Sequence, residues 1–168
     1  LLDYEQAQKL PQVEVVGVAC HIGSQITELS PFLEAVQRLR ELVEELDRRG
    51  IRIRYLDLGG GLGITYDQET PPHPREYGQA LIKELEGLGV TLILEPGRVI
   101  VGNAGILVTR VFYTKDSDAK HFIIVDAGMN DLARPSLYGS YHALWPVAQA
   151  PRREVTASLV GPICESGD

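Results

Sequence analysis

The chain alternates between short apolar runs and longer amphipathic stretches. Three apolar runs, at residues 13–20, 55–58 and 91–94, each stop at a cluster of glycine and polar residues. Runs of this length and β-rich composition are typical of buried parallel strands. Because α/β enzymes carry their chemistry just beyond the carboxyl ends of such strands, the three clusters predict one shared site.

Two amphipathic stretches between these runs predict helices. The first begins at Ser30-Pro31, a capping serine followed by a proline at the first helical position, and is expected to stop by Gly50. The second begins near Pro74 and is expected to end by Gly89. Their apolar residues recur every three or four positions: Leu33, Val36, Leu39, Val43 and Leu46 in the first, and Tyr77, Leu81, Leu85 and Leu88 in the second. Strands alternating with helices predict βαβ units, a parallel sheet and an α/β fold.

The spacing of the clusters limits the architecture further. They begin at residues 21, 59 and 95, which gives intervals of 38 and 36 residues. These intervals are slightly longer than the roughly 31 residues per unit of a typical (β/α)8 barrel. Three units cannot close a barrel, and periodicity alone leaves an open doubly wound sheet possible.

The pattern changes after residue 102. Residues 106–113 and 121–125 are β-rich and flank a turn-like segment at 115–118, which predicts a hairpin. Residues 132–151 contain prolines without a clear period, so an irregular loop is expected there, and residues 155–160 predict another short strand. The sequence therefore predicts an α/β domain over 1–102 and the start of an all-β domain over 103–168.

Composition excludes several classes of partner. The formal net charge is −7, the isoelectric point is about 5.1, and no basic stripe occurs, which argues against nucleic acid and anionic membranes as partners. No apolar stretch approaches the roughly 20 residues of a bilayer-spanning helix, and nothing resembles a signal peptide. Cys20 and Cys164 lie far apart and fit neither a disulfide framework nor a zinc site, so no metal and a cytoplasmic location are expected.

The glycine run at 59–63 can bring backbone N–H groups close to an anion, because no β-carbon obstructs the approach. Its spacing matches neither the dinucleotide-binding fingerprint nor a Walker A loop. A phosphate on a smaller cofactor fits better, and a tight strand-to-loop turn is the alternative. In the cluster at 21–25, His21 can stack on a flat ligand or transfer protons, or can be structural. Ser24 adds a hydroxyl that suits a phosphate oxygen.

The segment Glu95-Pro96-Gly97-Arg98 places a carboxylate and a guanidinium on a stiff turn. The simplest interpretation is a surface salt bridge, which contributes about 0–1 kcal/mol. Alternatively the two groups have separate tasks. A carboxylate beside a pyridine nitrogen keeps that nitrogen protonated, and Arg98 can hold a phosphate or carboxylate through its planar fork.

Two further clusters lie in the second half of the chain. Cys164 and Glu165 occupy a turn rich in glycine and polar residues, although an isolated cysteine is usually an inert small apolar residue. Arg134 and Tyr138 can bind a carboxylate or merely tie down a loop.

Taken together and in this order, five segments resemble the fold type III pyridoxal-phosphate decarboxylases, the ornithine/lysine/arginine decarboxylase family. These segments are HIGSQ at 21–25, LGGGLG at 58–63, EPGR at 95–98, DAGMNDLARPSLYGSYH at 126–142 and GPICESGD at 161–168. The glycine run and EPGR are shared with ornithine and arginine decarboxylases, whereas CESGD after this ARPSLYG loop favours the branch that acts on diaminopimelate.

The resemblance implies an alanine-racemase-like (β/α)8 barrel, followed by a β-sandwich-like domain, in a head-to-tail homodimer whose active sites are shared across the interface. It implies pyridoxal 5'-phosphate as cofactor and decarboxylation of meso-2,6-diaminopimelate to L-lysine and CO2. Ornithine, arginine or carboxynorspermidine as substrate is the alternative within the family. A non-catalytic homologue that binds partners through the dimer face is the alternative outside catalysis.

The resemblance also assigns roles to residues. His21 would stack on the cofactor ring, Glu95 would pair with the pyridine nitrogen, and Cys164 would be the catalytic proton donor. The cofactor phosphate would be held by Ser24, Gly61 and the Pro96-Gly97-Arg98 turn, and the substrate by Arg98, Arg134, Tyr138 and Glu165.

One departure concerns the covalent anchor of the cofactor. The family carries its Schiff-base lysine on the first barrel strand, and none of Lys9, Lys83, Lys115 and Lys120 has that context. A tyrosine expected late in the β domain is absent as well. We therefore expect this chain to be an internal piece of the enzyme that is inactive by itself.

Overall fold

The chain folds into two compact units. A computed structural model describes residues 1–151 and 154–168. The first unit comprises Leu1–Ala104 and the second Gly105–Asp168.

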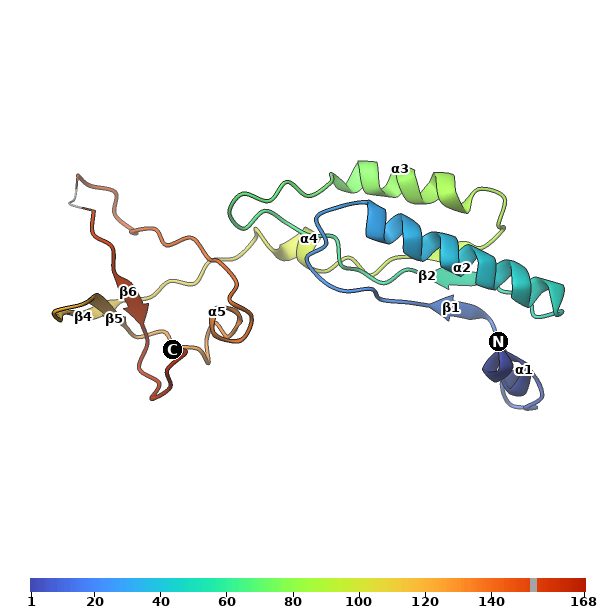
Figure 1. Cartoon of the computed structure of the whole chain (residues 1–168), viewed down its shortest axis with the longest axis horizontal. Coiled ribbons are helices and arrows are strands. Elements are labelled where there is room, and N and C mark those ends of the chain that lie inside the picture. Colours follow the sequence, from blue (N-terminus) through green and yellow to red (C-terminus); the bar gives the residue numbers. More distant parts are fainter. Residues whose placement is uncertain (152–153) are drawn as a thin grey trace. The chain divides into compact units, whose positions relative to one another are not determined.

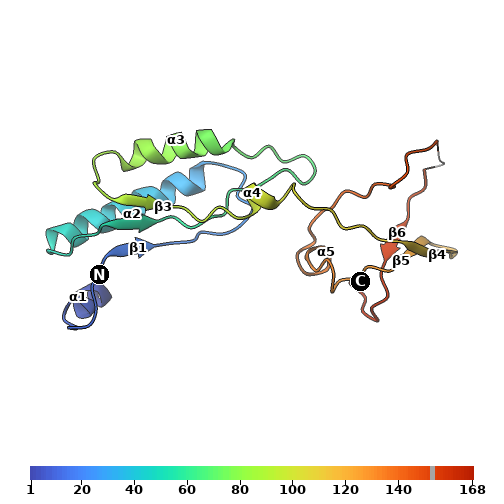
Figure 2. The same ribbon diagram turned by 180° about the vertical axis from the view of Figure 1, so that it is seen from behind.

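The first unit is a parallel sheet with two long helices on one face (Figures 1 and 2). Strands β1 (Gly17–Ala19), β2 (Tyr55–Asp57) and β3 (Thr91–Ile93) are parallel and lie in the order β1-β2-β3. Helix α2 (Ser30–Arg48) connects the first two strands, and α3 (Pro74–Leu85) connects the last two. The parallel α/β architecture predicted from the alternation of strands and helices is confirmed.

The core lies between these helices and the sheet. Phe32 and Tyr77 meet edge to face, with 4.7 Å between their ring centroids. Val36, Val43, Leu46 and Leu81 are buried as the period predicts, together with Val18 and Leu56 of the strands. Leu33, Leu39, Leu85 and Leu88, also expected inside, are half-buried at the margin. The amphipathic pattern therefore identified the correct helix faces.

The predicted cap of α2 is wrong. Ser30 is the first helical residue, and Leu29 is the N-cap with an αR backbone. Because Leu29 is already helical, Ser30 cannot take the extended conformation of a capping serine, and its hydroxyl donates to Glu28 Oε2 instead, at 3.4 Å. In α3 the cap is His73, whose Nδ1 accepts from the Arg75 amide at 3.1 Å.

Three short helices were not predicted. Helix α1 (Leu2–Gln8) buries no side chain, so it has no apolar stripe to detect. Helix α4 (Arg98–Val101) begins within the EPGR turn, and α5 (Arg134–Tyr138) lies inside the segment expected to be irregular. Each is too short to show a helical period, and the expectation of an irregular loop is wrong for α5.

The second unit contains a small mixed sheet. Strands β4 (Val111–Asp116) and β5 (His121–Val125) form the predicted antiparallel hairpin, and β6 (Ser158–Val160) pairs parallel to β5. The hairpin is confirmed, but its turn is closed at Ser117, whose amide donates to the Lys120 carbonyl at 2.9 Å. Two of the strands start later than predicted: β4 starts at residue 111 instead of 106, and β6 at residue 158 instead of 155.

Within residues 1–151 and 154–168, every helix is too short or too polar to cross a bilayer.

Candidate functional site

The loops that follow β1 and β2 run side by side. The Cys20 amide donates to Asp57 O at 2.9 Å, and the Ile26 amide donates to Gly61 O at the same distance. The Gly63 amide then donates to Ile26 O at 3.0 Å. These bonds continue the parallel pairing past the strand ends, with an isolated bridge between Ile26 and Leu62. The clusters at 21–25 and 59–63 are therefore neighbours.

The loop after β3 joins the same edge. The Leu58 amide donates to Ile93 O at 3.1 Å, and the Glu95 amide donates to Gly59 O at 2.8 Å. Because the carboxyl ends of parallel strands meet at one edge of a sheet, the three clusters that the sequence singled out are brought together. His21, Gly61 and Glu95 thus border the same edge of the first unit.

Close packing between these loops explains the glycine run. A β-carbon on Gly59, whose φ is +65°, would lie 2.7 Å from the Cys20 carbonyl oxygen. A β-carbon on Gly60 would overlap Glu95 O, and one on Gly61, whose φ is +107°, would overlap Gly23 O. The run therefore needs glycine for loop packing, whether or not a ligand approaches it.

One ring nitrogen of His21 accepts a hydrogen bond from the loop after β2. Its Nδ1 accepts from the Gly60 amide at 3.3 Å, so the neutral ring carries its proton on Nε2. The side chains of His21, Ser24 and Glu95 are exposed. They are accessible to a ligand that binds at this edge.

Arg98 follows β3 at the same edge, and its side chain is half-buried. Its Nη1 donates to Gln25 Oε1 at 3.1 Å, and its guanidinium lies 5.7 Å from the centroid of the Tyr66 ring. Among the residues that the structure describes, no carboxylate forms an ion pair with Arg98, so the simple interpretation of Glu95 and Arg98 as a surface salt bridge is wrong. The guanidinium keeps an uncompensated positive charge, which suits an anionic ligand.

Gln25 is the residue of this site that sequence reasoning missed. It contacts Arg98 and the backbone of Ile64, so it touches both other loops. The only signal in the sequence was its place at the end of the HIGSQ segment.

In the second unit, the structure brings Arg134 and Tyr138 together on α5. The Arg134 guanidinium lies 4.9 Å from the Tyr138 ring centroid. Arg134 Nε is buried and has no hydrogen-bond partner among the described residues. Because a buried donor without a partner is costly, this guanidinium has capacity for a further acceptor.

The turn that carries Cys164 and Glu165 is hydrogen-bonded to α5 and to the segment that leads into it. Asp168 accepts from the amides of Met129 and Ile163, and the Ser136 hydroxyl donates to Gly167 O. Both Cys164 and Glu165 are exposed. The four candidate substrate and catalytic residues of this unit thus lie on two connected segments.

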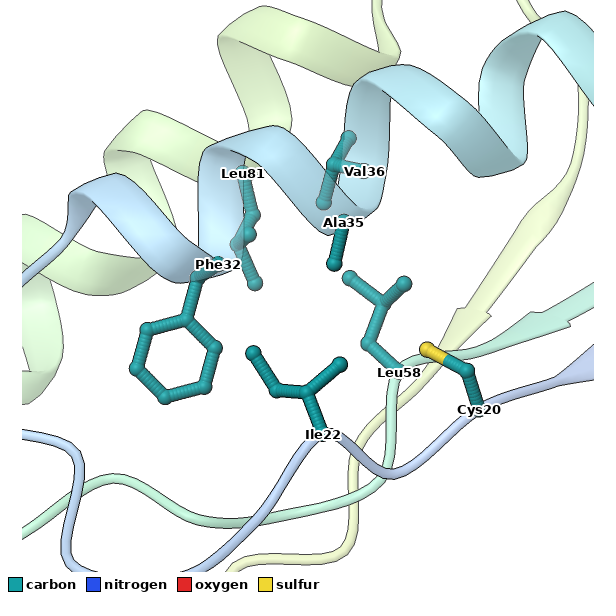
Figure 3. Close-up of a pocket in the computed structure, with 7 residues that line it drawn as sticks. All are labelled: Cys20, Ile22, Phe32, Ala35, Val36, Leu58 and Leu81. Carbon is teal, nitrogen blue, oxygen red and sulfur yellow. The ribbon is translucent and has the colours of Figure 1, made fainter.

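A small pocket beneath the strand ends is not part of this polar site. Its lining is apolar apart from one thiol (Figure 3), and consists of Cys20, Ile22, Phe32, Ala35, Val36, Leu58 and Leu81. Burial raises the pKa of the Cys20 thiol, and the carboxylate of Asp57 raises it further. A neutral thiol among apolar side chains offers nothing to a phosphate, so this pocket belongs to the core.

Comparison with known proteins agrees with these features. Residues 2–102 match the family model described as the pyridoxal-binding domain of pyridoxal-dependent decarboxylases. The chain is 54% identical to the diaminopimelate decarboxylases of Aquifex aeolicus and Pseudomonas aeruginosa, over 99% and 98% of its length. It is also similar to the crystal structure of diaminopimelate decarboxylase from Helicobacter pylori complexed with L-lysine. That match has a TM-score of 0.91 and 42% identity, and covers 98% of this chain and 41% of that one. The chain spans about 40% of the length of the two curated relatives.

Proposed function

This chain belongs to the family of pyridoxal-dependent decarboxylases, and from that premise we propose that it is part of an enzyme that converts meso-2,6-diaminopimelate to L-lysine and CO2. The substrate is supported by 54% identity, along nearly the whole chain, to proteins named diaminopimelate decarboxylase. One observation carries the chemistry. The loops after three parallel strands converge, and they bring a guanidinium without an ion-pair partner among the described residues to the same sheet edge as an exposed imidazole and an exposed carboxylate.

The residues at this edge fit pyridoxal 5'-phosphate. Its phosphate needs cationic, hydroxyl or backbone N–H donors: Arg98 would supply the cation, Ser24 the hydroxyl, and Gly61 and the Pro96-Gly97 turn an unobstructed backbone. When bound, the cofactor supplies an electron sink for the charge that remains after CO2 departs. The Glu95 carboxylate would hold a proton on the pyridine nitrogen, and this proton makes the ring a better acceptor of that charge.

His21 would hold the cofactor ring in place. The hydrogen bond from the Gly60 amide restrains one ring nitrogen of His21. A restrained imidazole loses less rotational freedom when it stacks on a flat aromatic ligand. This role requires the ring of His21 and not its basicity.

Residues of the second unit would bind the substrate and complete the reaction. The far end of diaminopimelate carries an amino group and a carboxylate, so both signs of partner are needed. Arg134 and Tyr138 would contact the carboxylate, and Glu165 the amino group. Cys164 would return a proton from Sγ to the α-carbon after CO2 has left.

The organisation of the enzyme follows from the same family resemblance. Residues 1–102 would form part of a (β/α)8 barrel, and residues 103–168 the start of a β domain. The enzyme would work in the cytoplasm as a homodimer in which Cys164 and Glu165 reach the site of the partner subunit. None of the four lysines lies on β1–β3 or in the loops that follow them, so the lysine that anchors the cofactor would lie outside these residues.

The proposal is tested with the complete protein that carries this sequence. Incubation with meso-diaminopimelate and pyridoxal 5'-phosphate should yield lysine and CO2 in equal amounts. Ornithine, arginine and carboxynorspermidine serve as competing substrates. A preference for one of these would contradict the proposed substrate and assign the protein to another branch of the family. Binding of the cofactor without release of CO2 from any substrate would indicate a non-catalytic homologue.

A further inference from the structure

We propose that Gln25 is a positioning residue that holds the guanidinium of Arg98 in place for an oxyanion. The identity of that oxyanion, a cofactor phosphate or a substrate carboxylate, rests on the proposed function. The placement of Arg98 by Gln25 does not. Three features of Gln25 carry the inference: its backbone conformation, its contacts with Ile64, and the neutrality of its amide.

The backbone of Gln25 is unusual. Its φ is +59°, and among the described residues every other positive φ belongs to glycine. The left-handed region is costly for a residue with a long side chain, and asparagine or glycine is found there more often. A glutamine in this conformation indicates that its extra reach is needed.

Both polar atoms of the Gln25 side-chain amide form hydrogen bonds to the backbone of Ile64. Gln25 Nε2 donates to Ile64 O at 2.5 Å, and the Ile64 amide donates to Gln25 Oε1 at 3.2 Å. This reciprocal pair resembles the exchange of bonds between two backbone strands. It holds the amide in one orientation, with Oε1 placed at the edge of the sheet.

The second lone pair of Gln25 Oε1 accepts from Arg98 Nη1 at 3.1 Å. One amide therefore connects the loops that follow all three strands of the first unit. The Tyr66 ring lies against the same guanidinium. Arg98 is thus held by an amide and an aromatic ring, and the remaining N–H groups of its fork can donate to an anion.

The neutrality of Gln25 matters as much as its geometry. A carboxylate at this position would also orient Arg98, but it would cancel the charge that attracts an anion. An amide orients the guanidinium and leaves its charge available. This difference separates the expected effects of two substitutions, Gln25→Asn and Gln25→Glu.

The experiment compares these variants in the complete protein, with affinity for pyridoxal 5'-phosphate and for pyridoxal measured by absorbance titration. Gln25→Asn tolerates the backbone but cannot reach Arg98, so affinity for an anion should fall roughly ten- to hundredfold. If the anion is the phosphate, pyridoxal 5'-phosphate is weakened and pyridoxal is not. If it is the substrate carboxylate, KM rises while cofactor affinity is unchanged. Gln37→Asn, an exposed glutamine of α2, is the matched control and should leave both values unchanged.

A readout that needs no cofactor separates this proposal from the proposed function. The rate at which phenylglyoxal modifies Arg98, followed by peptide mass spectrometry, should rise in Gln25→Asn because the guanidinium is released. Gln25→Glu loses the donor to Ile64 O but keeps an acceptor for Arg98, so that rate should rise less than in Gln25→Asn while anion affinity still falls. Should the wild-type protein fail to bind pyridoxal 5'-phosphate, the proposed function fails, and these rates still decide the role of Gln25.

A double-mutant cycle tests whether Gln25 acts through Arg98. In an Arg98→Gln background, Gln25→Asn should have no further effect on anion affinity or KM. An undiminished effect in that background would overturn the proposal. So would an unchanged phenylglyoxal rate in Gln25→Asn, provided that circular dichroism shows the variant to be folded.

Discussion

Gly60 and Glu95 meet backbone to backbone. A β-carbon on Gly60 would overlap the Glu95 carbonyl oxygen, and the neighbouring Gly59 carbonyl already accepts a hydrogen bond from the Glu95 amide at 2.8 Å. This contact joins the loops after β2 and β3. The position of the Glu95 carboxylate therefore depends on the absence of a side chain at residue 60.

Gly60→Ala should displace Glu95 and destabilise the fold by about 1–3 kcal/mol, because the backbone has no room to accommodate a methyl group. Cofactor affinity should fall with it. Denaturant unfolding and absorbance titration measure the two effects. Gly78→Ala in α3 is the matched control, since a β-carbon there meets no atom within 4 Å. It should stabilise the helix by about 0.5–1 kcal/mol.

Leu46→Ala should lower the free energy of unfolding by about 2–5 kcal/mol, because Leu46 is fully buried between α2 and the sheet. The adjacent Asp47→Ala removes an exposed side chain and should change stability by no more than about 0.5 kcal/mol. Urea denaturation of both variants tests the assignment of the buried face. Equal effects at the two positions would contradict it.

Asp57→Asn should make the Cys20 thiol easier to ionise. Burial is the first cause of the raised pKa of Cys20, and the Asp57 carboxylate is the second. Asparagine removes that charge, but its Oδ1 can still accept from the Gly59 amide as Asp57 does at 2.8 Å. The alkylation rate of Cys20 against pH, followed by mass spectrometry, should therefore shift to lower pH. Asp67→Asn, an exposed carboxylate in a loop, should leave the profile unchanged.

The same raised pKa predicts a loss of stability in alkaline solution. A thiol that ionises less readily in the folded state contributes stability below its ordinary pKa of 9.0. That contribution is lost as the pH rises through the higher pKa of the folded protein. Denaturant unfolding between about pH 8 and 11 should show a decline that is smaller in Asp57→Asn. Burial also raises the pKa of Tyr77, which adds to the decline in both proteins.

Cys164→Ala should lower kcat by roughly 10²–10⁴-fold if its thiol returns the proton to the α-carbon. The absorbance of the bound cofactor should be unchanged, because Cys164 has no proposed role in holding it. Steady-state kinetics with meso-diaminopimelate gives the first value, and a spectrum gives the second. Unchanged turnover would remove Cys164 from the mechanism.

Arg134→Lys should raise KM for the substrate by roughly tenfold or more, since lysine keeps the charge but loses the planar fork. Cofactor affinity should not change. Tyr138→Phe is the companion variant, because it retains the ring that lies 4.9 Å from the Arg134 guanidinium. If the Tyr138 hydroxyl contacts substrate, this variant also raises KM; if only the ring matters, its KM equals that of the wild type.

Local patterns in the sequence determined the parallel strands and the two long helices. Burial of one helix face requires apolar residues every three or four positions, and this spacing is visible in the sequence at Val36, Val43 and Leu81. Short elements without buried faces leave no such pattern, which is why α1 and α5 were missed. The false cap at Ser30 has a related cause, because residue type alone does not reveal that Leu29 is already helical.

For the candidate site, the sequence identified the residues of three clusters, and parallel-sheet topology predicted that these clusters would lie at one edge of the sheet. Only the tertiary structure decided how they meet. The contact of Gly60 with Glu95 and the bond from Arg98 to Gln25 join residues far apart in the chain. Such contacts depend on the exact path of each loop, which side-chain periodicity does not encode. The chemistry of the residues could thus be read from the sequence, whereas their partners were decided by packing.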